Sequence, residues 1–143
     1  MDIPMQKYAK IVGSDGCYLS CIVKAAEIHS KKEFDLLRTL DYCSKQKKNG
    51  HYWIDLEECF LWHPDKVMGY LLKKDVTVRK SDDINYKPKS NEIIIGCWER
   101  PTENKIYSHF GIPKNKKCIY DPLGNSNTIT YGELKSLRIF TIV

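Results

Sequence analysis

Apolar residues recur at helical spacing in the first half of the chain and in short alternating runs in the second half. The helical spacing predicts helices over residues 17–30, 33–46 and 64–72, the last beginning at Pro64 after His63. Beyond Asp75 the pattern changes to β-rich runs over 76–78, 92–98, 105–112, 117–120 and 137–143. We therefore expect an α+β fold in which N-terminal helices pack on a C-terminal antiparallel β-sheet.

The segments between these elements are polar or irregular. Residues 49–62 form an irregular aromatic stretch, and residues 81–91 form a polar connection. Turn residues occupy 101–104, 113–116 and 124–126. The link around 113–116 is short enough for a hairpin between the runs on either side of it.

The chain has the size of a single domain, which we place at residues 1–143. Its 143 residues are 42% hydrophobic and 29% charged, a composition typical of a folded protein, and its net charge is +5. No apolar run approaches the roughly 18 residues of a membrane span, and the first ten residues lack the apolar stretch of a signal peptide. These features predict a cytoplasmic protein whose six cysteines are reduced.

Cys17 stands where the first predicted helix begins, directly after the turn and capping residues 14–16. A cysteine attacks as a thiolate, and the unpaired N–H groups at a helix N-terminus favour negative charge. The position therefore indicates a nucleophile, although for an isolated cysteine a buried packing thiol is the more common interpretation. Cys21 falls one turn further along the same helix face, where packing is favoured, and the pair lacks the second cysteine pair of a zinc site.

His109 lies in an alternating run in which Tyr107, His109 and Gly111 share one face. A strand holds its side chains rigidly, which suits a general base that faces a thiol. The small residues Ser108 and Gly111 would leave room for a substrate chain. A partly buried histidine with one hydrogen bond is the structural alternative for His109.

Asp121 ends the next β-rich run and is followed by Pro122. The predicted hairpin would bring it beside His109, where a carboxylate can accept the Nδ1 proton of the imidazole and fix its tautomer. On its own, the segment 121–124 is an ordinary turn. His29, His51 and His63 lie in helix-end, loop or cap contexts and are weaker candidates for the base.

These three motifs together resemble those of the papain-like cysteine peptidase superfamily, above all its double-glycine (bacteriocin leader-processing) branch and the uncharacterised bacterial and phage relatives of that branch. The resemblance covers residues 8–30 and 92–143, and leaves 31–91 as a helical and aromatic insertion. It implies a papain-like fold in which Cys17 is the nucleophile, His109 the base and Asp121 the orienting acid. Such a site cleaves a peptide or isopeptide bond through a thioester intermediate, without a metal or an organic cofactor.

The chain departs from this family at two positions. Ile11 stands where the family usually has a glutamine that completes the oxyanion hole, and Tyr18 replaces a glycine. We therefore expect oxyanion donors from Gln6, Ser14 or the backbone N–H of Cys17. The same departures motivate a second hypothesis, a catalytically inactive papain-like binding protein, such as a phage protein that blocks a host factor.

The expected partner is a protein or peptide substrate, and no membrane is implied. Lysine clusters near Tyr52, Trp53 and Trp62 raise single-stranded nucleic acid as a third, weaker alternative. The structural alternative is that the lysines are solvated loop residues and the tryptophans pack onto the core. The substrate and the oligomeric state do not follow from the sequence.

Overall fold

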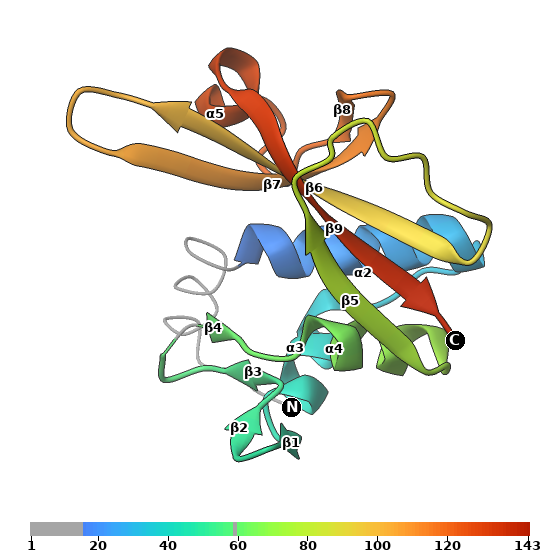
Figure 1. Cartoon of the computed structure of the whole chain (residues 1–143). Coiled ribbons are helices and arrows are strands. Elements are labelled where there is room, and N and C mark those ends of the chain that lie inside the picture. The colour runs from blue at the N-terminus through green and yellow to red at the C-terminus, as the bar shows by residue number, and fades with distance from the viewer. Residues whose placement is uncertain (1–15, 59) are drawn as a thin grey trace.

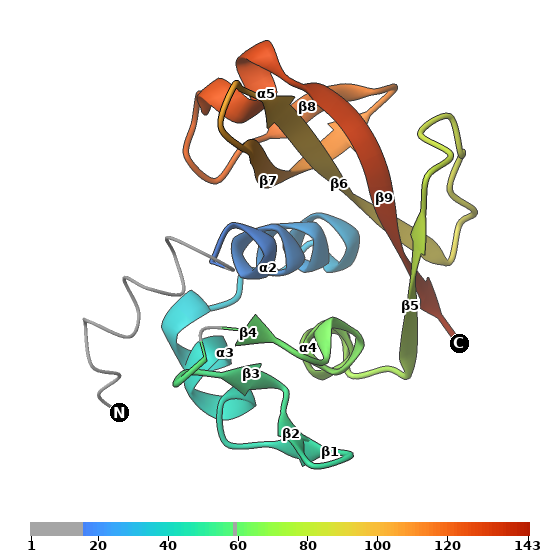
Figure 2. The same ribbon diagram turned by 60° about the vertical axis from the view of Figure 1, so that its left-hand side comes forward.

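Helices from the first half of the chain lie against one face of a twisted antiparallel sheet built from the second half (Figures 1 and 2). The computed structural model describes residues 16–58 and 60–143. The helices are α2 (Gly16–Ser30), α3 (Leu36–Cys43), α4 (Pro64–Leu72) and α5 (Asn127–Tyr131). The expected α+β class is confirmed.

The bounds of helices α3 and α4 follow from local residues at their ends. Helix α3 is shorter than the predicted 33–46 because Asp35 accepts a hydrogen bond from the Arg38 N–H at 3.0 Å and so caps its N-terminus. At the other end, the Ser44 N–H donates to the Leu40 carbonyl oxygen. Helix α4 begins at Pro64 as predicted, and Lys73 ends it in the left-handed conformation with φ of 55°.

The main sheet has the strand order β5-β9-β6-β7-β8, and each neighbouring pair is antiparallel. Its strands are β5 (Val76–Ser81), β6 (Glu92–Pro101), β7 (Ile106–Lys114), β8 (Lys117–Tyr120) and β9 (Glu133–Ile142). The predicted hairpin is confirmed. Lys114 pairs with Lys117, and Asn115 and Lys116 both have positive φ, which is the type I′ geometry of a two-residue turn.

Two features near the C-terminus differ from the sequence prediction. Residues 124–126 lie outside helix and strand as expected, but the helix α5 that follows them was not predicted; Ser126 caps it by accepting a hydrogen bond from the Ile129 N–H at 3.3 Å. Strand β9 begins at Glu133 rather than at residue 137, and a register shift at Cys97/Trp98 accommodates the additional pairing with β6.

Apolar clusters cover both faces of the sheet. One lies between the sheet and the helices and includes Leu19, Met68 and Phe140. The other lies on the face turned away from α2 and α4, and its buried members are Trp98, Leu134, Leu137 and Ile139. The aromatic rings of Tyr18 and Phe110 stack with their centroids 4.3 Å apart, which ties the start of α2 to β7.

The aromatic stretch between α3 and α4 is more regular than predicted. It contains two small antiparallel pairs, β1 (Lys47–Lys48) with β2 (His51–Tyr52), and β3 (Ile54–Asp55) with β4 (Phe60–Leu61). In the described part of the chain, none of the helices has both the length and the apolar character needed to cross a bilayer.

Candidate active site

The β7–β8 hairpin brings His109 and Asp121 into direct contact. The Nε2–H of His109 donates to Asp121 Oδ1 across 2.8 Å, and the two side chains are only 8% and 6% exposed. His109 is presented from the middle of β7, and Asp121 follows directly after β8. The contact therefore depends on the type I′ turn that sets the register of the two strands.

Asp121 is held by three further hydrogen bonds from its own loop. The Leu123 N–H donates to Oδ1 at 2.9 Å, and the N–H and hydroxyl of Ser126 donate to Oδ2 at 2.8 and 2.7 Å. Burial raises the pKa of this carboxyl, but the bonds from Ser126, Leu123 and His109 favour the ionised form more strongly. The net result is a pKa of about 2, below the ordinary 3.8. Asp121 is therefore an ionised and fixed hydrogen-bond acceptor for the imidazole.

Cys17 lies at the start of α2, next to the imidazole of His109. Burial is the largest influence on His109 and lowers its pKa, but hydrogen bonds to the side chains of Cys17 and Asp121, together with their charges, outweigh it. The pKa of His109 is consequently raised above 6.5. The arrangement is thus a chain of contacts from a thiol through an imidazole to a carboxylate, and it favours the imidazolium.

The predicted ring nitrogen for the contact with Asp121 was wrong. We expected Asp121 to accept the Nδ1 proton, whereas Asp121 is bonded to Nε2. Nε2 is therefore engaged by the carboxylate rather than by the thiol. Asp121 directly follows the last residue of β8, whose Tyr120 pairs with Ile112 of β7.

The expected substrate space beside Gly111 is filled by the protein itself. A Cβ at Gly111 would lie 3.0 Å from Cys118 Sγ, from Ile129 Cδ1 and from the carbonyl oxygen of Tyr120. The glycine therefore permits the close approach of β8 and α5 to β7. Ser108, the other small neighbour of His109, is exposed.

Cys21 packs in the core as predicted. It is fully buried, and this burial, reinforced by the charges of Cys17, Cys118 and Asp121, raises the pKa of its thiol. Burial likewise raises the pKa of Cys43 to about 12, and raises that of Cys97 and Cys118. These four thiols are therefore poor nucleophiles.

The other sequence candidates do not join this cluster. His51 stacks on Trp62 with ring centroids 3.8 Å apart, His63 precedes α4 and contacts the Lys48 carbonyl through Nε2 at 2.8 Å, and His29 is in the last turn of α2. Of the expected oxyanion donors, Gln6 and Ser14 lie outside the described residues. Within residues 16–58 and 60–143, no group of three or more His, Cys, Asp or Glu side chains is arranged to hold a metal ion.

Ser126 is the site residue that the sequence prediction missed. Its side chain both caps α5 and bonds Asp121, so it links the two ends of the loop that carries the carboxylate. A serine directly before a polar stretch, five residues after a candidate aspartate, is the signal that could have identified it.

Fold and site together define an α+β protein in which a cysteine at a helix start adjoins a strand histidine bound to an aspartate. Residues 5–142 match the family model described as Protein of unknown function, DUF261. Because the match covers nearly the whole chain, the protein belongs to this family. No curated protein and no solved structure matches it.

Proposed function

We propose that the protein is a cysteine peptidase-like thiol hydrolase with a papain-like fold, acting on a peptide or isopeptide bond. Cys17 is the proposed nucleophile, and His109 is the proposed general base and acid. Asp121 is the group that orients the imidazole and stabilises its protonated form. The observation that supports the proposal is that His109 contacts both groups: the side chain of Cys17, and Asp121 Oδ1 through Nε2 at 2.8 Å.

The proposed reaction follows from this geometry. The Cys17 thiol transfers its proton to His109, and its sulfur forms a bond to the carbonyl carbon of the substrate. The imidazolium then protonates the leaving amine as the C–N bond breaks, which leaves a thioester on Cys17. A water molecule deprotonated by His109 attacks the thioester, releases the carboxylic acid and restores the thiol.

The cytoplasm is the proposed compartment. Among the described residues, Cys17, Cys21, Cys43, Cys97 and Cys118 form no disulfide bond. Reduced thiols of this kind are typical of a reducing compartment. A thiol nucleophile also needs that environment to stay reduced.

The direct test is the rate at which iodoacetamide labels Cys17 at pH 6, followed by peptide mass spectrometry. We expect His109→Ala to slow the labelling of Cys17 by about 10- to 100-fold, because an unassisted thiol is almost fully protonated at that pH. His63→Ala, which removes a histidine whose ring contacts the Lys48 carbonyl instead, is the matched control and should leave the rate unchanged. Equal rates in His109→Ala and the parent protein would refute an activated nucleophile.

Hydrolysis itself is tested with a proteome-derived peptide mixture. We expect new peptide termini with the parent protein and none with Cys17→Ala, while Cys97→Ala, another buried cysteine, should retain the activity. The same new termini in the Cys17→Ala sample would exclude Cys17 as the nucleophile.

One observation favours the second candidate, an inactive papain-like binding protein. Cys17 is only 8% exposed, and a substrate carbonyl has to reach its sulfur. This candidate is supported if Cys17 resists iodoacetamide in the parent protein at pH 6 and if the binding of a captured protein survives Cys17→Ala.

A further inference from the structure

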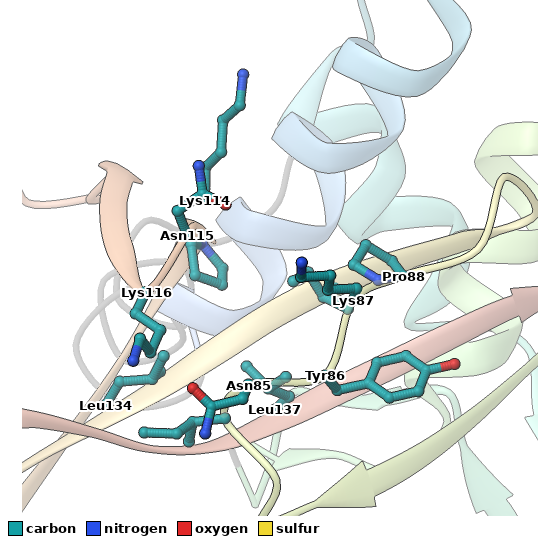
Figure 3. A pocket seen from close by; sticks show the side chains of 12 residues that line it. Asn85, Tyr86, Lys87, Pro88, Lys114, Asn115, Lys116, Leu134 and Leu137 are labelled. Carbon is teal, nitrogen blue, oxygen red and sulfur yellow. The ribbon is translucent and has the colours of Figure 1, made fainter.

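A hollow of about 520 Å³ lies on the sheet face turned away from α2 and α4 (Figure 3). The loop 84–88 forms one side, and the turn Lys114–Lys116 forms the other. The floor is aliphatic and consists of Ile94, Leu134 and Leu137. The size falls within the range of roughly 300–1,000 Å³ that is typical of ligand sites. We name this site the lysine-rimmed hollow.

The rim carries three lysines, and the described part of the chain places no carboxylate in ion-pair contact with them. Lys87 comes from the loop, and Lys114 and Lys116 come from the turn. Within residues 16–58 and 60–143, none of their ammonium groups lies within 4.0 Å of a carboxylate. The nearby Glu92 is already engaged, because its Oε1 accepts hydrogen bonds from the Tyr86 hydroxyl at 2.5 Å and from the Lys89 N–H at 2.9 Å. Figure 3 shows the Lys114 side chain extending away from Leu134 and Leu137. Among the described residues, the rim therefore presents positive charge without paired carboxylates beside an apolar floor.

We propose that the lysine-rimmed hollow binds an acidic peptide segment of another protein, whose aliphatic side chains rest on the floor while its carboxylates face the rim lysines. Charge complementarity and the apolar floor together select a partner that carries both properties. The site lies on the opposite sheet face from the contact between α2 and β7, so its occupancy does not depend on the Cys17 reaction.

The shape and the rim chemistry favour a peptide over a fatty-acid anion. An acyl chain is best held in an enclosed apolar tunnel, whereas the lysine-rimmed hollow is open to solvent along its exposed rim. The two sides also carry side-chain amides, Asn85 on the loop and Asn115 on the turn. An amide can donate to a carbonyl and accept from an N–H, which are the two groups that a peptide backbone offers.

The test uses a capped heptapeptide of four glutamates and three leucines, titrated into ¹⁵N-labelled protein. We expect saturable shifts of the backbone amides of Ile94, Asn115, Leu134 and Leu137. A version with lysines replacing the glutamates, and one with serines replacing the leucines, should each bind at least several-fold more weakly. Higher salt should weaken the acidic peptide because exposed charges are screened.

Matched variants distinguish the effect of the rim lysines on binding from the effect of the net charge of the protein. Lys87→Gln, Lys114→Gln and Lys116→Gln combined should weaken binding by about 10-fold, given the modest strength of each exposed ion pair. Lys32→Gln, Lys66→Gln and Lys74→Gln combined remove the same charge from exposed positions in the helical half and should leave the affinity unchanged.

Three outcomes would overturn the proposal. One is the absence of saturable shifts at about 1 mM peptide, the weak end of specific binding. Another is an equal loss of affinity in the two triple variants. The third is that laurate shifts the same amides while the acidic peptide does not, which would assign the site to a fatty-acid anion.

Discussion

At the scale of single residues, Asp121 takes part in most of the hydrogen bonds of the site. Its two oxygens accept from His109, Leu123 and Ser126, through four donor groups in all. A carboxylate can accept all four, whereas an amide of the same shape offers only one acceptor oxygen. The site therefore depends on the charge of this residue as well as on its shape.

Asp121→Asn should make the protein less stable above pH 4. Because the pKa of Asp121 is about 2 in the folded protein and 3.8 ordinarily, its contribution is present above pH 4 and is lost as the pH falls toward 2. We expect a loss of about 1–2 kcal/mol at pH 5, after allowing for solvent screening, and a smaller difference from the parent at pH 3. Urea unfolding at both pH values measures this. Asp41→Asn, which removes a surface partner of Lys45, is the control.

The same variant should lower the pKa of His109, because burial continues to lower it while the hydrogen bond and charge of Asp121 no longer raise it. An NMR titration of the His109 ring protons reports the shift. An unchanged titration would show that Asp121 does not set the charge of the imidazole.

The ring nitrogen of His109 that contacts Asp121, Nε2, could not be predicted from the sequence. The order of Cys17, His109 and Asp121 along the chain is enough to suggest that they meet. That Nε2 rather than Nδ1 contacts Asp121 depends on the orientation of the ring in three dimensions, which the order of residues does not specify.

At the scale of elements, the β7–β8 hairpin determines whether the histidine and the aspartate meet. Gly111→Ala should weaken it, since the new Cβ would lie 3.0 Å from the carbonyl oxygen of Tyr120, a backbone atom just before Asp121. We expect a loss of about 1–3 kcal/mol in the free energy of unfolding. Thermal unfolding measures the loss, and Ser108→Ala, at an exposed position on the same strand, is the control. Equal stability of both variants would contradict the close packing of β8 and α5 around Gly111.

The elements predicted well are those with local signals. Helix α4 has Pro64 in its first turn, and the β7–β8 connection is a short polar link between two β-rich runs. Helix α5 has no apolar period, and its start depends on Ser126, whose hydroxyl also bonds Asp121. The first half of β9 pairs with β6 only across a register shift, so its extent depends on tertiary packing.

At the scale of the whole molecule, the site exists because α2 and β7 are held together by packing. The stack of Tyr18 on Phe110, at 4.3 Å, lies one residue from Cys17 on the helix and one from His109 on the strand. A second stack of almost the same geometry, Tyr42 on Tyr70 at 4.2 Å, lies away from the site. Comparing the two stacks separates an effect on the stability of the protein from an effect on the assembly of the site.

Phe110→Leu should lower the pKa of His109, because a looser α2 weakens the hydrogen bond from Cys17 that helps to raise it. Tyr70→Leu should leave that pKa unchanged. Both variants should lose about 1 kcal/mol of stability through the lost aromatic stacking. Urea unfolding and an NMR titration of His109 measure the two effects separately. Equal shifts of the His109 pKa in both variants would argue against a specific role of the Tyr18 stack.

The place of β9 in the sheet has a consequence for biosynthesis. Although residues 133–142 are made after all the other strands, β9 lies between β5 and β6. A nascent chain on the ribosome therefore has β5 and β6 without the strand that joins them, and the Cys17 helix without a finished sheet to rest on. The elements that carry Cys17, His109 and Asp121 can pack on a complete sheet only after translation has passed residue 142. A chain terminated before β9 therefore lacks the sheet that holds these three residues in place.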